Sequence, residues 1–414
     1  MSESMKVLQI NATYGVGSTG LIVQDIGQAL ASAGHEAYFA YQTAPESPAN
    51  GYRVGNAADH KRHALLARLL GGQGFYSRHA TAKLCRYIDR ISPDVVHLHN
   101  LHSNFVHLPR LLAHLAQRDI PTVITMHDCW FFTGKCFHYA DVGCDKFRHA
   151  CGNCPKKSAP PASLLVDRTE RDLNRKIAAL TAIPRLYLVG CSDWICGEAR
   201  SSRLSACDVR RIYNGVDTSV FAPRDRAALK AEQGLAGKQV ILGMANKWLQ
   251  PANRPLLDAV VSGMPADRTL CLVGCTDKQK QELATLGDRV RATGFVSERD
   301  EMARLYAMAD VFVNPTRADT LPTVNMESIC AGTPVVTYAV GGSPELIDAD
   351  TGMVVPEGDV SAVLQAIEEM LSQDTPTCSA TGKARFDKNE CYGAYVDLYR
   401  TVCASENRKE EAPI

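Results

Sequence analysis

Two acidic residues stand eight positions apart in the C-terminal part of the chain, within the stretch NPTRADTLPTVNMESICAG. Asp319 falls in a predicted loop and Glu327 in the predicted helix that follows it. A carboxylate accepts paired hydrogen bonds from vicinal hydroxyl groups, which suits recognition of a sugar or a ribose. The helix begins between the two acids, and the N–H groups of its first turn can hold a diphosphate. The residues at this helix start are Leu321, Pro322, Thr323 and Val324.

A glycine-rich loop, GVGSTG at residues 15–20, follows the first predicted strand and precedes a helix. Its letters match the dinucleotide fingerprint G-x-G-x-x-G, but the next strand ends in AYQT, without the acidic residue that holds a ribose in that fold. We therefore predict only that Gly17, Ser18 and Thr19 bring backbone N–H groups close to an anion or a sugar. The alternative is a tight turn with a structural role.

Four of the fifteen cysteines are clustered, at Cys136, Cys144, Cys151 and Cys154. Four thiolates at this short spacing predict a closed tetrahedral zinc site that would fix the loop carrying residues 130–132 near the substrate site. Such a site has no open position, so its metal would be structural and not a cofactor of catalysis. The alternatives are free buried thiols or, less expected in a reducing compartment, disulfides.

Short apolar strands alternate with helices along almost the whole chain, which predicts α/β architecture. The first series of predicted strands covers residues 6–11, 36–41, 94–98, 121–126 and 185–190, and the second covers 239–244, 269–273, 310–313 and 334–338. Each series predicts a doubly wound parallel sheet with right-handed crossovers. Because the candidate residues follow strands, we expect the site at the carboxyl ends of the strands, in a cleft between the two halves.

The composition indicates a two-domain globular protein of 414 residues, with a boundary predicted between residues 208 and 209. Lys plus Arg and Asp plus Glu both number 45, so no net charge points to nucleic acid as a partner. We expect a cytoplasmic location, because the start lacks a signal-peptide pattern and no apolar run is long enough for a membrane span. The charged tail, residues 405–414, is expected to be disordered.

A basic and apolar stretch between residues 60 and 88 offers a possible contact with the inner-membrane surface. It carries six Lys or Arg residues interleaved with leucines and aromatic residues. Such a patch can lie on an anionic leaflet as a peripheral membrane contact. The alternative is a solvated helix face that packs on the domain core.

The sequence resembles the family-4 retaining glycosyltransferases, which have the GT-B fold of two Rossmann-like domains facing a cleft. The resemblance rests on the two acids followed by ESICAGTPVV and GGSPE, and on PDVVHLHN, MHD and YNGVD. The block from residue 125 to 155, THDCWFFTGKC with the later cysteines, is similar to the colanic-acid and exopolysaccharide branch. The family resemblance implies an acceptor-binding domain at residues 1–208, a donor-binding domain at 209–387, and a helix at 388–404 that crosses back to the first domain.

The resemblance also implies roles for individual residues. Glu327 would bind the ribose hydroxyls, Asp319 the hydroxyls of the donor sugar, and His127 the sugar near the reacting centre. Backbone groups around Phe295 and Val296 would contact the base. The reaction would be transfer of a hexose from a UDP- or GDP-sugar to a lipid-linked saccharide in exopolysaccharide, capsule or O-antigen synthesis, with retained anomeric configuration and without a metal ion.

One segment departs from the family pattern. Relatives place an Arg and a Lys after the first strand of the second domain, whereas this chain has Pro251 and Ala252 there. Lys247 and Arg254 are the nearby cations that would replace them at the diphosphate. Two alternatives therefore remain open: a catalytically degenerate partner in a polysaccharide assembly complex, and a nucleotide-sugar epimerase of the same architecture.

Overall fold

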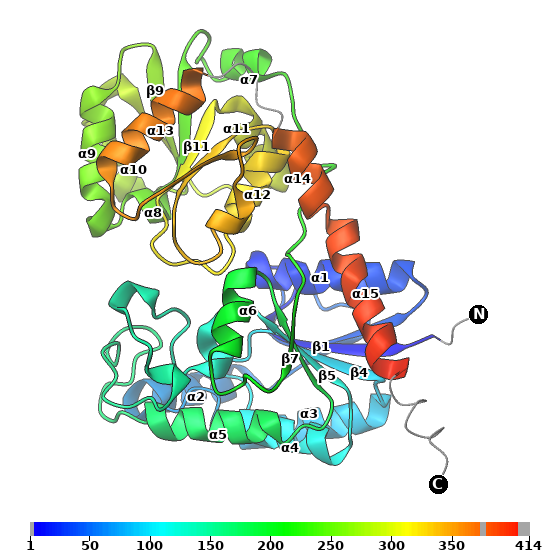
Figure 1. Ribbon diagram of the computed structural model, residues 1–414. Helices are drawn as coiled ribbons and strands as arrows, with labels where there is room; N and C mark the ends of the chain where they lie inside the picture. The colour runs from blue at the N-terminus through cyan, green and yellow to red at the C-terminus, as the bar shows by residue number, and fades with distance from the viewer. Residues whose placement is uncertain (1–3, 373–377, 405–414) are drawn as a thin grey trace. The chain divides into compact units, whose positions relative to one another are not determined.

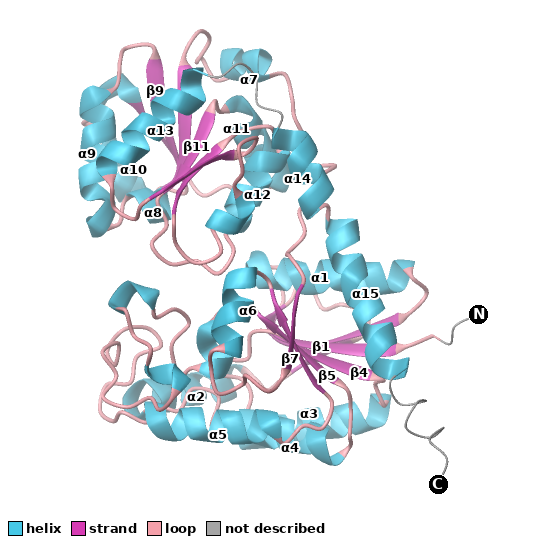
Figure 2. Cartoon of the chain, in the orientation of Figure 1, coloured by secondary structure: helices cyan, strands magenta, loops and turns pink. Residues whose placement is uncertain are grey.

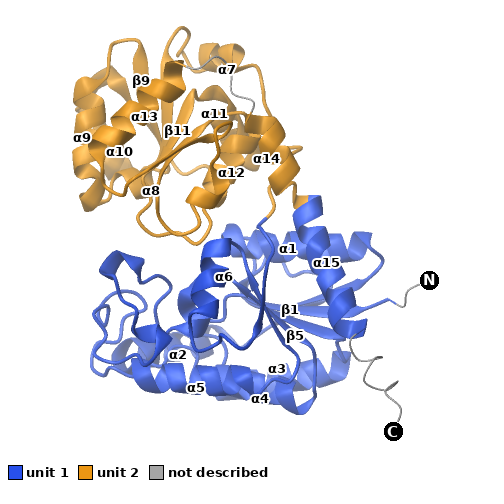
Figure 3. Ribbon diagram, in the orientation of Figure 1, with its two compact units in different colours: residues 1–214, 389–414 blue, residues 215–388 orange. Residues whose placement is uncertain are grey.

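The computed structural model describes residues 4–372 and 378–404 of the chain. The chain divides into two compact units, coloured separately in Figure 3. Unit 1 comprises residues 1–214 and 389–414, and unit 2 comprises residues 215–388. The predicted boundary at residue 208 falls six residues too early, because the segment from Asp208 forms the last strand of the first sheet. The predicted disordered tail, 405–414, lies outside the described residues.

Unit 1 is built on a seven-stranded sheet in which every neighbouring pair of strands is parallel. In sheet order, its strands are β3 (Gly51–Arg53), β2 (Glu36–Thr43), β1 (Lys6–Thr13), β4 (Val95–Leu98), β5 (Thr122–Met126), β6 (Leu186–Gly190) and β7 (Asp208–Arg211). The strand order changes direction between β1 and β4. In parallel α/β sheets, ligands bind beside such a switch point, at the carboxyl ends of the strands.

Helices cover both faces of this sheet (Figures 1 and 2). They are α1 (Gly17–Ser32), α2 (Ala57–Leu70), α3 (Arg78–Ile91), α4 (Leu108–Gln117), α5 (Thr169–Thr181), α6 (Asp193–Arg200) and α15 (Lys388–Ala404), with short 3-10 helices at Cys129–Phe132, Ala140–Val142 and Lys146–Arg148. Helices α1 and α15 lie on one face, and α3, α4 and α5 lie on the other.

Helix α15 comes from the far end of the sequence and completes the core of unit 1. Its tyrosines and valines pack with Ile22, Ile26 and Leu30 of α1 and with the apolar side chains of the central strands. Tyr399 and His97 form a buried hydrogen bond of 2.7 Å between the hydroxyl oxygen and Nδ1. Because the whole of unit 2 lies between the first sheet and α15 in sequence, unit 1 is a discontinuous domain.

Unit 2 repeats the architecture with a six-stranded parallel sheet. In sheet order, its strands are β10 (Val290–Thr293), β9 (Arg268–Val273), β8 (Gln239–Met244), β11 (Val311–Asn314), β12 (Val335–Tyr338) and β13 (Gly352–Val355). Its helices are α7 (Arg226–Glu232), α8 (Ala245–Trp248), α9 (Arg254–Gly263), α10 (Asp277–Ala284), α11 (Arg299–Met308), α12 (Thr323–Cys330), α13 (Val360–Ser372) and α14 (Cys378–Phe386), with 3-10 turns at Pro251–Asn253, Gly287–Arg289 and Pro344–Leu346.

The two doubly wound parallel sheets confirm the predicted fold class. All nine predicted strands are present, and the four that the sequence analysis missed are β3, β7, β10 and β13. These four are the edge strands of the two sheets. Edge strands are short and partly exposed, so they lack the continuous apolar run that marks a buried parallel strand.

The hydrogen bond between Tyr399 and His97 yields a stability prediction. We expect Tyr399→Phe to lower the free energy of unfolding by about 1–3 kcal/mol, because a buried ring nitrogen of His97 loses its partner. Chemical denaturation measures this change. Tyr38→Phe is the matched control, since its hydroxyl bonds to Glu36 at the surface and its loss is expected to cost under about 0.5 kcal/mol. Equal effects of the two variants would contradict the prediction.

Candidate functional site

In unit 2, Glu327 occupies the middle of α12 and is half-buried. The hydroxyl of Tyr306, a buried residue of α11, donates a hydrogen bond to Glu327 Oε2 at 3.3 Å. Burial raises the pKa of Glu327 to about 7, although Arg299 and the bond from Tyr306 act in the opposite direction. A carboxylate held this way is poorly solvated by its surroundings, so a ligand that donates hydroxyl hydrogen bonds would stabilise its charged form.

Asp319 and Lys247 meet at the carboxyl ends of the two central strands of unit 2. Lys247, in the short helix after β8, places its Nζ 3.8 Å from Asp319 Oδ2 and 3.0 Å from Thr316 Oγ1. The loop after β12 closes on the same place. Gly341 has φ of +56°, and a Cβ at this position would lie 1.8 Å from the carbonyl oxygen of Asp319. Glycine is therefore required for the two loops to approach each other.

Four buried polar atoms near the start of α12 have no hydrogen-bond partner among the described residues. They are Asn314 Oδ1, Thr320 Oγ1, Asn325 Nδ2 and Ser343 Oγ. The two asparagines bond to each other through their remaining amide groups at 2.7 Å. Buried polar groups in native proteins are normally paired, because an unpaired one costs about 1–3 kcal/mol. This group of donors and acceptors is suited to a polar ligand at the carboxyl end of β11.

The first turn of α12 adds main-chain donors to the same region. The helix begins at Thr323 after Pro322, and no acidic side chain or side-chain cap occupies its N-terminus. Leu321 and Pro322 are buried, whereas Thr323 and Val324 are half-buried. The helix start is therefore compatible with an anion such as a diphosphate.

The two cations predicted to replace the missing basic pair lie in different places. Lys247 lies beside Asp319, as described above. Arg254 begins α9 and bonds instead to Asp258 one turn later, with Nε 2.8 Å from Oδ1, on an exposed surface. Arg317 contacts the segment where the pair was expected, because its Nε donates to Asn253 Oδ1 at 3.0 Å. It also forms an ion pair with Glu357 at 2.7 Å.

The residues predicted to contact the base lie in the loop after β10. Phe295 is the most exposed large apolar residue among those described, with 87% of its surface accessible, and Val296 is half-buried. The exposed ring follows an edge strand, on the same carboxyl side of the sheet as Lys247 and Asp319. An exposed aromatic ring at this edge offers a surface on which a planar ligand can stack.

In unit 1, the glycine-rich loop joins β1 to α1. Gly15 and Gly17 both have positive φ, at +67° and +68°. Residues 17–19 form the first turn of α1, which has neither a side-chain cap nor an acidic residue. Thr19 Oγ1 accepts a 3.5 Å hydrogen bond from Asn11 Nδ2, which also donates to the carbonyl of Thr13. The structure thus places Gly17, Ser18 and Thr19 at an uncapped helix start.

His127 follows β5 directly and lies next to a second histidine of the neighbouring strand. The Nε2 of His127 is 3.0 Å from Nδ1 of His99, and the two rings are stacked with an interplanar angle of 15°. Burial lowers the pKa of His127 to about 4, against the opposing charge of Asp128. His127 is therefore neutral at physiological pH. Asp128 is paired with His102 at 2.8 Å.

The aromatic segment at residues 130–132 belongs to the core of unit 1. Trp130, Phe131 and Phe132 are between 0% and 2% exposed. The buried ammonium group of Lys176 lies 4.2 Å from the centre of the Trp130 ring and donates to the carbonyl of Trp130. Burial lowers the pKa of Lys176 to about 8. These aromatic side chains therefore anchor the segment in the interior of unit 1.

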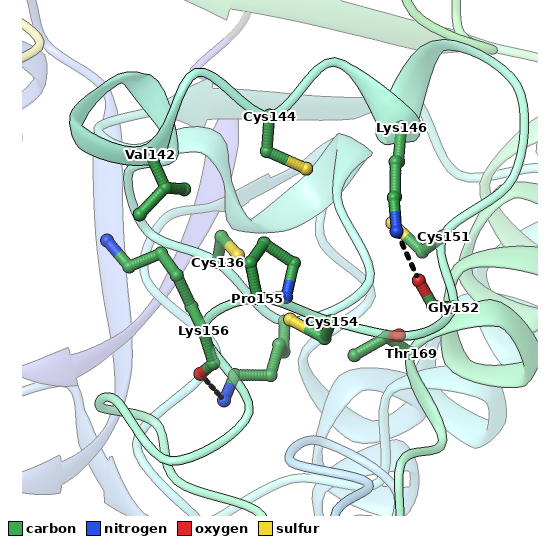
Figure 4. Close-up of a pocket in the computed structure, with 11 residues that line it drawn as sticks. Cys136, Val142, Cys144, Lys146, Cys151, Gly152, Cys154, Pro155, Lys156 and Thr169 are labelled. Atoms are coloured by element: carbon green, nitrogen blue, oxygen red, sulfur yellow. Dashed lines mark hydrogen bonds between the residues drawn. The ribbon is translucent and has the colours of Figure 1, made fainter.

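The four clustered cysteines line one pocket of unit 1 (Figure 4). Their thiols are free, and a hydrogen bond between Cys136 and Cys154 raises the pKa of the first and lowers that of the second. Within residues 4–372 and 378–404, however, no group of three or more His, Cys, Asp or Glu residues is arranged to hold a metal ion. Lysine side chains also bond within this loop, as when Lys146 Nζ donates to the carbonyl of Gly152 at 3.0 Å. Structural zinc remains a prediction.

Several residues of these sites were not identified from the sequence. Tyr306 and Thr316 are the partners of Glu327 and Lys247, and Gln9 and His99 are linked to His127. The motif PDVVHLHN contains His99, and its position after a buried strand was a usable signal. Tyr306 and Gln9 lie inside a helix and a strand with no local pattern, so only the tertiary structure identifies them.

Two family models match the chain. The model described as Glycosyltransferase Family 4 matches residues 20–220, and the one described as Glycosyl transferases group 1 matches residues 242–373. Together they cover most of both units.

Curated relatives give partial and full-length similarity. A D-inositol 3-phosphate glycosyltransferase of Mycobacteroides abscessus is 31% identical over 39% of this chain, and the match spans 38% of that relative. The chain thus matches only about two fifths of the length of such relatives. A putative colanic acid biosynthesis glycosyl transferase, WcaC of Escherichia coli K12, is 23% identical over 96% of this chain and 100% of its own length.

Solved structures share the fold. Sucrose-phosphate synthase from Thermosynechococcus elongatus superposes with a TM-score of 0.69 at 20% identity, covering 97% of this chain and 100% of that one. Anabaena HepE, solved with UDP-glucose, has a TM-score of 0.61 at 16% identity over 96% of this chain and 100% of its own. The two family matches, the full-length relative and the paired parallel-sheet units together establish that the chain belongs to the family-4, group 1 glycosyltransferases of GT-B fold.

Proposed function

We propose that the protein transfers a hexose from a UDP- or GDP-sugar to a lipid-linked saccharide in the synthesis of exopolysaccharide, capsule or O-antigen. The observation that carries this proposal is the group of four unpartnered buried polar atoms around the start of α12, beside Glu327. Support also comes from relatives, since HepE was solved with UDP-glucose and the full-length relative is named for colanic acid biosynthesis.

In the proposed donor site, each element of unit 2 has one task. Glu327 accepts hydrogen bonds from the ribose hydroxyls, and Asp319 binds hydroxyls of the donor sugar. Lys247 and the N-terminus of α12 neutralise the diphosphate, so Lys247 replaces the missing basic pair and Arg254 has no part. Phe295 and Val296 would contact the base. The positive charge that neutralises the leaving diphosphate comes from these groups and not from a metal ion.

The proposed reaction retains the anomeric configuration by front-face attack. The acceptor hydroxyl attacks the anomeric carbon as the bond to the diphosphate breaks, and the leaving diphosphate takes the acceptor's proton. The protein then contributes by positioning the reactants and by stabilising the charge of the leaving group. A degenerate partner protein would bind a nucleotide without turnover, and an epimerase would change the donor without an acceptor.

A mixed basic and apolar surface on unit 1, which we call the α2 surface, is the proposed membrane contact. Among the described residues, eight large apolar side chains are exposed, and four of them lie here: Leu65, Leu164, Leu165 and Val166. The segment at 164–166 is tied to the end of α2, because the N–H groups of Leu164 and Leu165 donate to the carbonyls of Arg68 and Leu69 at 2.8 and 2.9 Å.

The charges of the α2 surface favour an anionic leaflet. Lys61, Arg62 and Arg68 are exposed on α2, around Leu65. Of the apolar residues predicted for this contact, Phe75 is buried, so it belongs to the core, and the segment at 164–166 was not predicted. None of the described helices is both long and apolar enough to cross a bilayer. We propose a peripheral contact on the cytoplasmic face of the inner membrane.

The donor site is tested by Glu327→Gln. We expect one nucleotide from a panel of UDP, GDP, ADP and dTDP to bind the wild type, and the variant to bind it about 10- to 100-fold more weakly, because a charge-assisted hydrogen bond is lost. Calorimetry measures the affinity. Glu369→Gln on the exposed face of α13 is the matched control and should bind like the wild type. Unchanged binding by Glu327→Gln would refute the role of this acid.

The raised pKa of Glu327 gives a pH prediction. Unfolded chains release a Glu proton near pH 4.3, whereas folded Glu327 releases it at about 7, so the folded state binds more protons between these values. Stability from this group is therefore present at about pH 4 and is lost as the pH rises through about 7. Denaturation at about pH 5 and about pH 8 should show a larger loss for the wild type than for Glu327→Gln. Parallel losses would contradict the prediction.

The α2 surface is tested with vesicles. We expect the wild type to float with vesicles of phosphatidylglycerol and phosphatidylcholine, and to float less with phosphatidylcholine alone or at high salt. Leu65→Ser with Leu165→Ser should reduce binding to the anionic vesicles about tenfold or more, because apolar surface no longer enters the interface. Val354→Ser, at an exposed valine of unit 2, is the control. Equal flotation of all three proteins would show that the α2 surface is not the membrane contact.

A further inference from the structure

A chain of hydrogen bonds leads from the backbone of α1 to His127. Gln9, on β1, donates from Nε2 to the carbonyl of Val23 at 3.0 Å. The Oε1 of Gln9 lies 3.2 Å from Nε2 of His99, and Nδ1 of His99 lies 3.0 Å from Nε2 of His127. Gln9 and His99 are both 0% exposed. The three residues therefore form one buried series that begins at a main-chain carbonyl.

The direction of each bond in this series follows from its first member. A carbonyl oxygen only accepts, so the amide nitrogen of Gln9 must face Val23 and its oxygen must face His99. That oxygen also only accepts, so Nε2 of His99 carries a proton. In a neutral ring the other nitrogen is then an acceptor, and Nε2 of His127 must donate to it. His127 consequently keeps a lone pair on Nδ1.

These bond directions hold when both rings are neutral. Burial lowers the pKa of His99 well below its usual value, and the neighbouring rings of His97 and His127 act in the same direction. Around His127, the carboxylate of Asp128 favours a proton and His102 opposes it, but burial dominates. Asp128 is already bonded to His102 and to the N–H of Trp130. Both rings are neutral near pH 7.

We propose that Gln9 and His99 are positioning residues that hold His127 with its proton on Nε2, so that Nδ1 accepts a hydrogen bond from a ligand hydroxyl. The choice of ligand group rests on the proposed function, because it assumes that a sugar binds beside His127. The fixed tautomer does not depend on that function. The tautomer follows from the three hydrogen bonds that link Val23, Gln9, His99 and His127 within unit 1.

The fixed tautomer also specifies the chemical class of the group that His127 recognises. A lone pair on a neutral ring attracts an O–H or N–H donor and repels a carboxylate or phosphate oxygen. His127 would therefore select an uncharged, hydroxyl-bearing part of the donor sugar. It would contribute nothing to binding the diphosphate, for which the cationic form or the opposite tautomer would be needed.

The test is nitrogen NMR of the full-length protein labelled with ¹⁵N-histidine, at neutral pH and without ligand. We expect His127 to show a protonated Nε2 and an unprotonated Nδ1 as a single tautomer. Gln9→Met removes the acceptor for His99, so the single tautomer should be lost and both forms should be populated. A proton on Nδ1 of His127 in the wild type, or a doubly protonated ring, would overturn the proposal.

A matched control separates this effect from general loosening of the core. Tyr399→Phe breaks a buried bond to His97, the ring next to His99, but leaves the three bonds of the series intact. His127 should keep its single tautomer in this variant. Loss of the tautomer in Tyr399→Phe as well as in Gln9→Met would mean that packing, and not Gln9, sets the proton position.

The ligand is tested by adding UDP-glucose to the same labelled protein. A hydroxyl that donates to Nδ1 should shift its resonance while the ring stays neutral. Protonation of Nδ1 on binding would overturn the acceptor role. If UDP-glucose binds without moving this resonance, the hydroxyl contact is refuted while the fixed tautomer stands. If it does not bind, UDP-glucose is not the donor, and the ligand-free spectrum still decides the tautomer.

Discussion

The buried face of the first sheet depends on α15. This face carries Gln9, His97 and His99, polar side chains that are each 0% exposed, and burying such groups is costly unless they are paired. The hydroxyl of Tyr399 pairs with His97, and the hydroxyl of Tyr395 pairs with Thr125, which in turn bonds the other ring nitrogen of His97. The polar layer is thus satisfied from both sides, by the sheet and by a helix from the end of the chain.

That polar layer reaches the carboxyl edge of the sheet. The ring of His97 lies 3.9 Å from that of His99, which is in turn stacked on His127. Three histidines therefore lead from the core toward the position where a ligand of a parallel sheet binds. Their burial keeps them uncharged, so their hydrogen bonds, and not their charge, determine how they contact a ligand. The candidate site of unit 2 differs: it contains the partly desolvated carboxylate of Glu327 and a group of unpaired amide and hydroxyl atoms.

Much of this arrangement was predictable from the sequence, and the exceptions have physical causes. Central parallel strands are apolar on both faces, so each appears in the sequence as a continuous apolar run. Edge strands such as DVRR at Asp208–Arg211 have no such run. Glu327 and His127 were predicted because each belongs to a recognisable motif, His127 directly after β5 and Glu327 in the helix that follows β11. Gln9 and Tyr306 were not, because their roles arise from contacts between distant segments. The ion pair of Arg254 with Asp258, at i,i+4 on α9, was not considered in the sequence analysis.

The discontinuity of unit 1 also sets an order of events during synthesis. Unit 2 is complete once residue 388 has left the ribosome, but unit 1 still lacks α15 at that moment. At about 5–20 residues per second, the stretch from residue 214 to residue 404 takes roughly 10–40 s to translate. Throughout that interval the apolar and histidine-bearing face of the first sheet lacks the part of its cover that α15 supplies. Unit 1, which begins to be synthesised first, is therefore completed last. Its exposed sheet face is the surface that a chaperone would need to protect.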